Sequence, residues 1–289
     1  MATATASPTL PATAAEDFET LMVPSNMGPV AVQVQWARSG GDAAIYLLDG
    51  LRAPDFANDW TKTPAPEAFK DDNVTVVMPV GGHGSWYVDW SQPPAADGRP
   101  WLWEKFLTED LPGFLARYGI SRQRNAVVGV SMGASAALML SAYHREQFVC
   151  ATALSGYLDW HSPGGAGAVQ STIVLAGLDP RRLSSLEGAQ WDRMDPYVFA
   201  PKLRGLPMYI YAAQGAPTTS ESSDNPLAAA GAIAIESLAY SSTLRFKDRL
   251  ESLGIAAEYD LPLVGTHSWS HWGDALVAAR PSILRTLGD

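Results

Sequence analysis

The sequence has 289 residues, of which 47% are hydrophobic and 17% are charged, which is the composition of a folded globular protein and not of a disordered chain. Acidic residues (30) outnumber Lys and Arg (20), and the basic residues form no cluster, so we expect no nucleic-acid binding. The single cysteine, Cys150, excludes an internal disulfide and a cysteine-built metal site, and we expect it to be a buried core thiol. No run of about 18 uninterrupted apolar residues occurs, so we do not expect an integral membrane protein.

The first residues have a composition of their own. Residues 1–15 are rich in Ala, Thr and Pro, carry no charged side chain, and lack the long apolar region of an intact signal peptide. We therefore predict a flexible leader over residues 1–17 and a single domain over residues 18–289.

Short apolar or alternating segments predict the strands of this domain. Residues 31–36 alternate apolar and polar side chains, which is typical of a half-buried strand. Further strands are predicted at residues 44–48, 74–79, 126–130, 148–154, 208–213 and 257–261. Helical spacing of apolar residues predicts helices at residues 101–118, 132–144, 227–253 and 274–287. Strands that alternate with helices predict an α/β fold with a mostly parallel sheet covered on both faces.

A G-x-S-x-G motif occupies residues 129–133, with Ser131 at its centre. A predicted strand leads into the motif and an Ala-rich predicted helix follows it, which is the strand–turn–helix context of a nucleophile elbow. The N-terminus of that helix favours developing negative charge. We therefore predict that Ser131 is a catalytic nucleophile and not only a capping serine in a Gly-rich turn.

A serine hydroxyl needs a neighbouring base before it can attack a carbonyl carbon. The chain has five histidines: His83, His144, His161, His267 and His271. In this arrangement the base follows the last strand, so only His267 and His271 lie late enough. His267 is the predicted base because it lies in the loop after strand 257–261. His83 is a candidate pocket residue, and His144 is expected at a helix end.

The base needs a carboxylate that orients it, and this acid usually follows strand 208–213. Position alone leaves Glu221, Asp224 and Glu236 open. Glu221 and Asp224 belong to the polar loop 216–225, whereas Glu236 lies in an apolar helical segment where a carboxylate requires a partner.

Several segments together resemble one family. They are YLLDGLRA (46–53), VVMPVGG (76–82), WYVDW (86–90), WEKFLTEDLP (103–112), GVSMGAS (129–135), LSGYLD (154–159) and GTHSWSHW (265–272). On these segments the chain resembles the antigen 85 mycolyltransferases of mycobacteria and their corynebacterial relatives, from about residue 21 to the C-terminus. The resemblance implies an α/β-hydrolase fold.

The resemblance also implies roles for individual residues. It implies a triad of Ser131, Glu236 and His267, because Glu236 lies 31 residues before His267, at the family's spacing. The implied oxyanion hole consists of the backbone N–H groups of Leu51 and Met132. The implied substrate-binding residues are Asp49, Arg52, Asp159, Leu238, Ala239, Tyr240, Ser241, Arg245, Ser268 and Trp269. An alternative for Asp49 and Arg52 is a structural ion pair in a tight turn.

The chain departs from the family pattern at several positions. Gly133 stands where the family often has another small residue, and residues 61–64 (TKTP) replace a segment with an Asn near the sugar site. Ala212 or Ala213 stands where the family has a Cys, and residues 69–77 do not match its fibronectin-binding segment. The change at residues 61–64 concerns the details of the trehalose site, and all three residues of the implied triad are present.

The implied reaction is the transfer of a mycolyl group from trehalose monomycolate to a second trehalose monomycolate or to cell-wall arabinogalactan. It needs no metal or organic cofactor, and it implies a secreted or cell-envelope location, with diacylglycerol acyltransferase or esterase activity as a side reaction. Residues 164–186 are a candidate wall for the acyl chain, or alternatively helix core. The alternatives are a secreted carboxylesterase or lipase that transfers the acyl group to water, and a non-catalytic sugar-binding or adhesin protein on the same fold.

Overall fold

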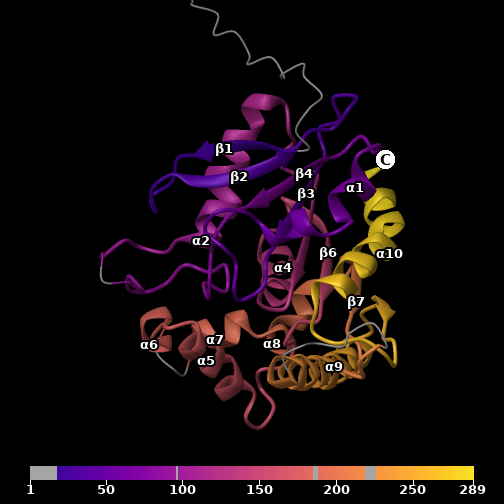
Figure 1. Ribbon diagram of the computed structural model, residues 1–289. Coiled ribbons are helices and arrows are strands. Elements are labelled where there is room, and N and C mark those ends of the chain that lie inside the picture. The colour runs from indigo at the N-terminus through magenta and orange to yellow at the C-terminus, as the bar shows by residue number, and fades with distance from the viewer. Residues whose placement is uncertain (1–17, 96, 185–187, 219–225) are drawn as a thin grey trace, which may run out of the picture.

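The computed structural model describes residues 18–95, 97–184, 188–218 and 226–289. The predicted leader 1–17 lies outside the described residues, as do Glu221 and Asp224. The described strands form one eight-stranded sheet in the order β1-β2-β4-β3-β5-β6-β7-β8 (Figure 1). They are β1 (Glu19–Val23), β2 (Val30–Gln35), β3 (Ala44–Leu48), β4 (Thr75–Pro79), β5 (Asn125–Val130), β6 (Phe148–Leu154), β7 (Met208–Tyr211) and β8 (Glu258–Asp260).

The sheet is mostly parallel, as the sequence predicts. Strand β2 pairs antiparallel with β1 and β4, and the other neighbouring strands pair parallel. Strand β1 was not predicted from the sequence. It forms the edge of the sheet, and its residues are partly exposed except for Leu21 and Val23. Thr20 and Met22 are exposed and Glu19 is half-buried, so the apolar residues of β1 form only a run of three, Leu21 to Val23.

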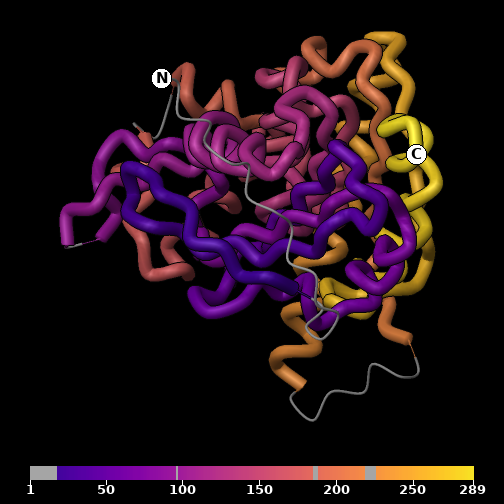
Figure 2. Tube along the Cα trace, turned by 90° about the horizontal axis from the view of Figure 1, so that it is seen from above, coloured from indigo at the N-terminus to yellow at the C-terminus, as the bar shows by residue number. Residues whose placement is uncertain are grey.

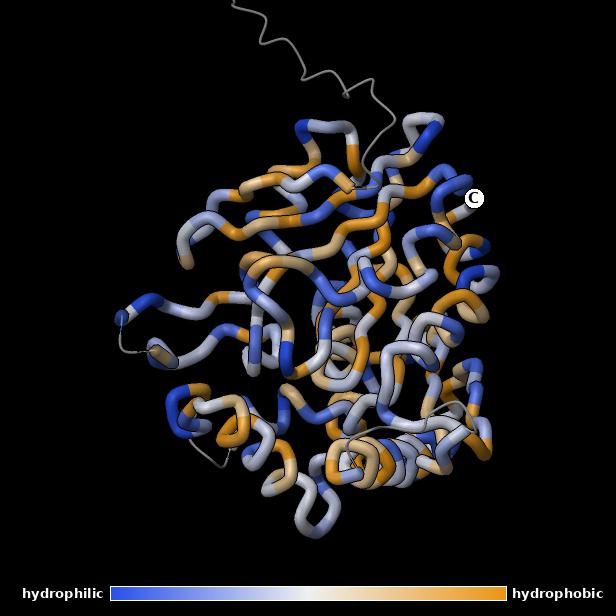
Figure 3. Tube along the Cα trace, in the orientation of Figure 1, coloured by the Kyte–Doolittle hydropathy of each residue, from blue (hydrophilic) through white to orange (hydrophobic). Residues whose placement is uncertain are grey.

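The central strands are buried at every position. All residues of β3, β4 and β5 are buried, because helices cover both faces of a parallel sheet. Figure 3 shows hydrophobic colour along these strands. Cys150 in β6 is buried as predicted, and burial raises the pKa of its thiol to about 12.

The helices form two layers, one on each side of the sheet. They are α1 (Ala65–Phe69), α2 (Trp103–Lys105), α3 (Leu111–Leu115), α4 (Met132–Tyr143), α5 (Gly165–Leu175), α6 (Pro180–Leu183), α7 (Ala189–Met194), α8 (Pro196–Phe199), α9 (Pro226–Ser252) and α10 (Trp269–Leu287). One core cluster joins a face of the sheet to α3, α4, α7, α8 and the C-terminal part of α9. The other cluster joins the opposite face to α1 and α10, which Figure 2 shows along one side of the molecule.

Two predicted helices differ in detail from the observed ones. The helix predicted over residues 101–118 is divided into α2, a π-helical turn (Phe106–Asp110), α3 and a 3₁₀ turn (Ala116–Tyr118). The final helix begins at Trp269 and not at 274, because Ser268 has the extended backbone of a residue before a helix. His271 therefore lies in the first turn of α10.

Helix α9 is long and apolar enough by composition to cross a membrane. In this fold its side chains Glu236, Ser242, Thr243, Phe246 and Leu250 are buried against the rest of the protein. Figure 1 shows α9 below the ends of the central strands. The structure therefore uses α9 as a covering helix of the α/β fold.

The fold brings several loops to one edge of the sheet. The carboxyl ends of parallel strands meet at the same edge, which is where α/β proteins bind ligands. The segments that follow β3, β5, β6, β7 and β8 contain Leu51, Ser131, Ser155, Ala213 and His267 in turn. This edge contains the candidate active site.

Candidate active site

Ser131 occupies a strained turn between β5 and α4. Its φ is +55°, a conformation that costs a non-glycine residue about 1–3 kcal/mol. Its backbone N–H donates a hydrogen bond of 2.8 Å to the carbonyl of Leu154, at the end of the neighbouring strand. The turn therefore presents the serine next to the end of β6.

The two glycines of the motif are required by space. A Cβ atom on Gly129 would lie 1.9 Å from the carbonyl oxygen of Gly133. A Cβ atom on Gly133 would lie 2.5 Å from the carbonyl oxygen of Asp49. Close packing of the first turn of α4 against β5 and the end of β3 thus excludes larger residues at both positions.

Glu236 and His267 form a direct pair at the same edge of the sheet. The Oε2 atom of Glu236 lies 2.7 Å from Nδ1 of His267, and the glutamate is fully buried. The His267 side chain retains 12% exposure, so its ring lies at the boundary with solvent. Glu236 therefore has the burial and contact that an orienting carboxylate requires.

Two residues that the sequence did not single out support the pair. Ser155 Oγ donates to Glu236 Oε1 at 2.7 Å, and the backbone N–H of Ala213 donates to the same oxygen at 2.8 Å. The indole N–H of Trp272 donates to Ser155 Oγ at 2.9 Å. The Trp272 ring also meets the His267 ring edge to face at 4.7 Å. Trp272 and Ser155 thus fix both partners of the acid–base pair.

The Ser131 hydroxyl makes no hydrogen bond to His267 in the described structure. Such contacts are often long in ligand-free enzymes and tighten when substrate binds. Ser131 is nevertheless tied to the pair through the backbone, since its N–H binds Leu154 and the next residue, Ser155, binds Glu236.

The backbone N–H groups of Leu51 and Met132 donate no hydrogen bond to any described residue. Met132 directly follows Ser131. Leu51 follows Gly50, where a Cβ atom would lie 3.5 Å from Ser131 Cβ. Two such donors beside Ser131 are the arrangement that can stabilise an oxyanion.

Three other histidines make different contacts or are exposed in the described part of the chain. His144 caps the C-terminal end of α4 with its Nε2 2.7 Å from Glu104 Oε1, and a helix of this length places it roughly 20 Å from Ser131. His83 Nε2 lies 3.1 Å from the carbonyl oxygen of Ala176, and His161 is exposed. Only His267 among the predicted candidates meets Glu236.

Asp49 is fully buried beside the Leu51 turn. Both of its carboxyl oxygens accept the backbone N–H of Asp59, at 3.1 and 3.2 Å. Burial raises the pKa of Asp49 to about 8, and the nearby charge of Asp59 acts in the same direction. The described structure has no ion pair between Asp49 and Arg52, so the ion-pair alternative is wrong.

This burial predicts a dependence of stability on pH. An unfolded aspartate ionises near pH 4, whereas folded Asp49 keeps its proton up to about pH 8. Its contribution is therefore complete below about pH 4 and is lost as the pH rises toward 8. We expect Asp49→Asn, which keeps an acceptor for the Asp59 N–H, to lose less unfolding free energy than the wild type between pH 5 and 8. Urea denaturation at both pH values measures this, and equal losses would contradict it.

The remaining predicted sugar-site residues are distributed over the same edge. Arg52 is exposed, next to Leu51. Trp269 packs edge to face on Trp60 at 5.2 Å and on Trp272 at 5.1 Å. The Ser268 hydroxyl lies 3.1 Å from that of Ser270. Trp269 and Ser268 thus lie directly beside the base in sequence, with Trp269 partly buried against its aromatic neighbours.

Asp159 and Arg245 form an ion pair at 2.5 Å between the segment after β6 and helix α9. Asp159 is buried, whereas the Arg245 side chain is 42% exposed. The four consecutive residues of α9 predicted at the site face different ways, because successive helical residues rotate by about 100°. Leu238 and Ser241 are exposed, Ala239 is buried, and the Tyr240 hydroxyl accepts the Gln214 side-chain N–H at 3.1 Å.

The segment predicted as a wall for the acyl chain contains both buried and exposed apolar residues. Val169 and Ile173 of α5 are buried in the core, which is the alternative that the sequence left open. Val174 and Leu175 are 59% and 83% exposed. This exposed end of α5 presents apolar side chains that an acyl chain could contact.

Comparisons with known proteins place these features in a family. Residues 26–283 match the Esterase family. Diacylglycerol acyltransferase/mycolyltransferase Ag85B of Mycobacterium avium is 36% identical over 282 residues, covering 93% of this chain and 83% of the relative. Diacylglycerol acyltransferase/mycolyltransferase Ag85A of Mycobacterium tuberculosis is 37% identical over 282 residues, covering 93% and 81%.

Solved structures agree with this result. MPT51 of Mycobacterium tuberculosis has a TM-score of 0.79 at 28% identity and covers 94% of this chain and 100% of its own. An S-formylglutathione hydrolase from Agrobacterium tumefaciens has a TM-score of 0.67 at 15% identity, covers 94% and 95%, and bears on the fold alone. The chain therefore has the α/β-hydrolase fold and belongs to the antigen 85 family of mycolyltransferases, within the wider esterase family.

Proposed function

We propose that this protein is a serine acyltransferase that moves a mycolyl or similar long acyl group from trehalose monomycolate to a sugar hydroxyl. The observation that carries the proposal is the buried Glu236–His267 pair, 2.7 Å apart, beside the strained Ser131 turn. Family membership supports acyl transfer, since the relatives are named as acyltransferases.

The reaction follows the Ser-His-acid scheme. His267 takes the proton of Ser131 as the hydroxyl oxygen attacks the acyl carbon, and Glu236 stabilises the resulting imidazolium. The N–H groups of Leu51 and Met132 bind the oxyanion. His267 then gives the proton to the departing trehalose oxygen, which leaves an ester on Ser131. No metal or organic cofactor takes part in this scheme.

The second half of the reaction decides the product. A hydroxyl of another trehalose monomycolate, or of arabinogalactan, gives its proton to His267 and attacks the Ser131 ester. The bond between the acyl carbon and the Ser131 oxygen then breaks, His267 returns its proton to that oxygen, and the products are trehalose dimycolate or mycolylated cell wall. Because these acceptors belong to the cell envelope, we further propose that the protein acts there after secretion.

Two other functions use the same fold. A carboxylesterase or lipase would have water as the acceptor, and membership of the Esterase family favours this second candidate. A non-catalytic sugar-binding or adhesin protein would not need the buried acid–base pair. The contacts that Ser155, Ala213 and Trp272 make around Glu236 and His267 support an enzyme.

One assay separates the three functions. The purified protein is incubated with a trehalose monoester, and the lipids are resolved by chromatography, with Ser131→Ala as the matched control. Transferase activity yields the diester, hydrolase activity yields the free acid, and a binding protein leaves the monoester unchanged. A wild-type product pattern equal to that of Ser131→Ala would contradict both enzymatic proposals.

The sugar site leads to a prediction about acceptor choice. Arg52 presents a rigid donor fork next to the Leu51 oxyanion donor, and it is exposed. We expect Arg52→Ala to slow acyl transfer to trehalose about 10-fold or more, because an oriented acceptor no longer reaches the acyl-enzyme ahead of water. Hydrolysis of a small activated ester, which needs no sugar, should change less than about 2-fold.

Both rates are measured on the same preparation. Arg285→Ala is the matched control, since Arg285 is exposed on the last turn of α10 and is far along the chain from the Leu51 turn. An equal fall of transfer and hydrolysis in Arg52→Ala would indicate a damaged oxyanion turn, and the sugar role of Arg52 would be dropped.

A further inference from the structure

The loop after β4 contains two consecutive residues in an unusual backbone conformation. Trp86 and Tyr87 have φ values of +56° and +52°, although bulky side chains rarely adopt positive φ. Ser85 fixes the loop from within, since its hydroxyl accepts the Tyr87 N–H at 3.0 Å and its carbonyl accepts the indole N–H of Trp90 at 3.0 Å. Strain of this kind persists only where neighbouring contacts enforce it, and it is concentrated at functional sites.

The loop holds the first oxyanion donor from two sides. The backbone N–H of Gly84 donates to the carbonyl of Leu51 at 2.9 Å. The backbone N–H of Asp49 donates to the hydroxyl of Tyr87 at 3.0 Å. Tyr87 is fully buried, and its ring packs edge to face on Trp103 at 5.5 Å. These contacts fix the turn on both sides of Gly50 and leave the Leu51 N–H without a partner among the described residues.

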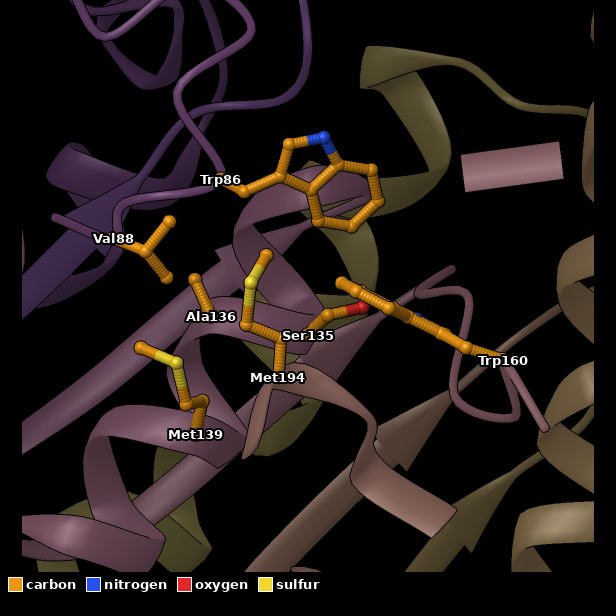
Figure 4. A pocket seen from close by; sticks show the side chains of 7 residues that line it. All are labelled: Trp86, Val88, Ser135, Ala136, Met139, Trp160 and Met194. Atoms are coloured by element: carbon orange, nitrogen blue, oxygen red, sulfur yellow. The ribbon is translucent and has the colours of Figure 1, made fainter. Parts of the chain in front are cut away.

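The same loop also contacts the second donor. The backbone N–H of Trp86 donates to the Met132 sulfur at 3.1 Å. Figure 4 shows Trp86 and Val88 of this segment facing α4 across a small apolar pocket. The pocket is lined by Trp86, Val88, Ser135, Ala136, Met139, Trp160 and Met194. The loop therefore packs along the helix whose first residue supplies the Met132 N–H.

We propose that residues 84–87 are a positioning element for the oxyanion hole, with the Tyr87 hydroxyl as its main positioning group. The inference rests on the proposed function, because it assigns Leu51 and Met132 as oxyanion donors. Those donors belong to separate segments, one after β3 and one at the start of α4, and this loop contacts both segments. Oxyanion donors accelerate the reaction only when they are held in place beforehand, and a displacement of about 1 Å costs on the order of 100-fold in rate.

The test compares two tyrosines that differ in this contact. Tyr87→Phe removes the hydroxyl that accepts the Asp49 N–H. Tyr259→Phe is the matched control, because the Tyr259 hydroxyl is buried and has no hydrogen-bond partner among the described residues. Met132→Leu is a second variant, which removes the sulfur acceptor of the Trp86 N–H and keeps the side-chain volume. Each protein is titrated with a fluorophosphonate to count the molecules whose Ser131 is reactive. Every kcat value is then calculated per reactive molecule.

For Tyr87→Phe we expect kcat on a small activated ester to fall about 10- to 100-fold with KM nearly unchanged. The inhibition constant of an alkylboronic acid, which forms a tetrahedral adduct with the serine, should rise by the same factor. Met132→Leu should show a smaller fall of the same kind, and Tyr259→Phe should stay within about 2-fold.

Four results would overturn the inference, three of them kinetic or stability measurements on Tyr87→Phe. In the first, Tyr87→Phe has the same kinetics as Tyr259→Phe. In the second, Tyr87→Phe only lowers the fraction of protein that the fluorophosphonate labels, or only lowers the melting temperature, while kcat per labelled site stays normal. In the third, KM rises and kcat is unchanged. Boronate inhibition that stays constant while kcat falls would also contradict it. If the fluorophosphonate does not label Ser131 in the wild type, the proposed function itself fails, and this inference fails with it.

Discussion

Ser131→Ala is expected to lower acyl-transfer turnover by about 10⁵- to 10⁶-fold, since the covalent intermediate can no longer form. The substitution leaves the turn intact, because alanine fits where serine fits and the Ser131 backbone N–H still binds Leu154. Turnover of the trehalose monoester, measured by chromatography, gives the rate. The melting temperature of the variant reports whether the fold is kept.

A neighbouring serine provides the control for this experiment. Ser135 lies one turn along α4, and its hydroxyl donates to the carbonyl of Tyr157 at 2.9 Å. Ser135→Ala should keep near-normal turnover although it removes the same chemical group from the same helix. If Ser131→Ala retains near-normal turnover, Ser131 is not the nucleophile.

Glu236→Gln is expected to lower turnover by about 10⁴-fold. Glutamine can still accept hydrogen bonds from Ser155 and Ala213, so its side chain fits the same pocket. Its amide N–H₂ would then face His267 Nδ1, which must accept instead of donate. The ring is thereby forced into the tautomer whose Nε2 carries a proton and cannot act as a base.

The alternative acids serve as controls for Glu236. Glu221→Gln and Asp224→Asn change the carboxylates of the loop that position alone left open. Both should retain turnover close to that of the wild type. If one of them is the damaging substitution and Glu236→Gln is not, the assignment of the acid is wrong. The pH profile of the Glu236→Gln variant adds a second measure of His267 function.

Much of the fold could be predicted from the sequence, because the central strands are short apolar runs buried on both faces. The predictions at 44–48 and 148–154 coincide with β3 and β6. Strand β1 could not be predicted, since its edge position leaves only Leu21 and Val23 buried. The start of α10 was placed too late because residues 269–272 are aromatic or polar, residue 273 is glycine, and none of them shows helical spacing of aliphatic side chains.

The residues of the proposed triad are marked by local context in the sequence, whereas the contacts that support them are not. Ser155 and Glu236 are 81 residues apart, and Trp272 and Ser155 are 117 apart, so only the folded chain brings them together. The sequence nevertheless contained a signal for these supporting residues. Ser155, Trp272 and Tyr87 all lie in the segments that carry the family resemblance, and each could have been examined as a support for a neighbouring catalytic residue.

The environment of Cys150 bears on how the proposed activity could be inhibited. The thiolate is the form of cysteine that reacts with alkylating agents and oxidants, and a pKa of about 12 keeps this sulfur protonated at neutral pH. The side chain is also enclosed between β6 and α10, with 4% of the residue exposed. The chain has no other cysteine. Electrophiles aimed at a cysteine thiol thus have no accessible target in the folded protein, and a covalent inhibitor of the proposed activity has the Ser131 oxygen as its intended target.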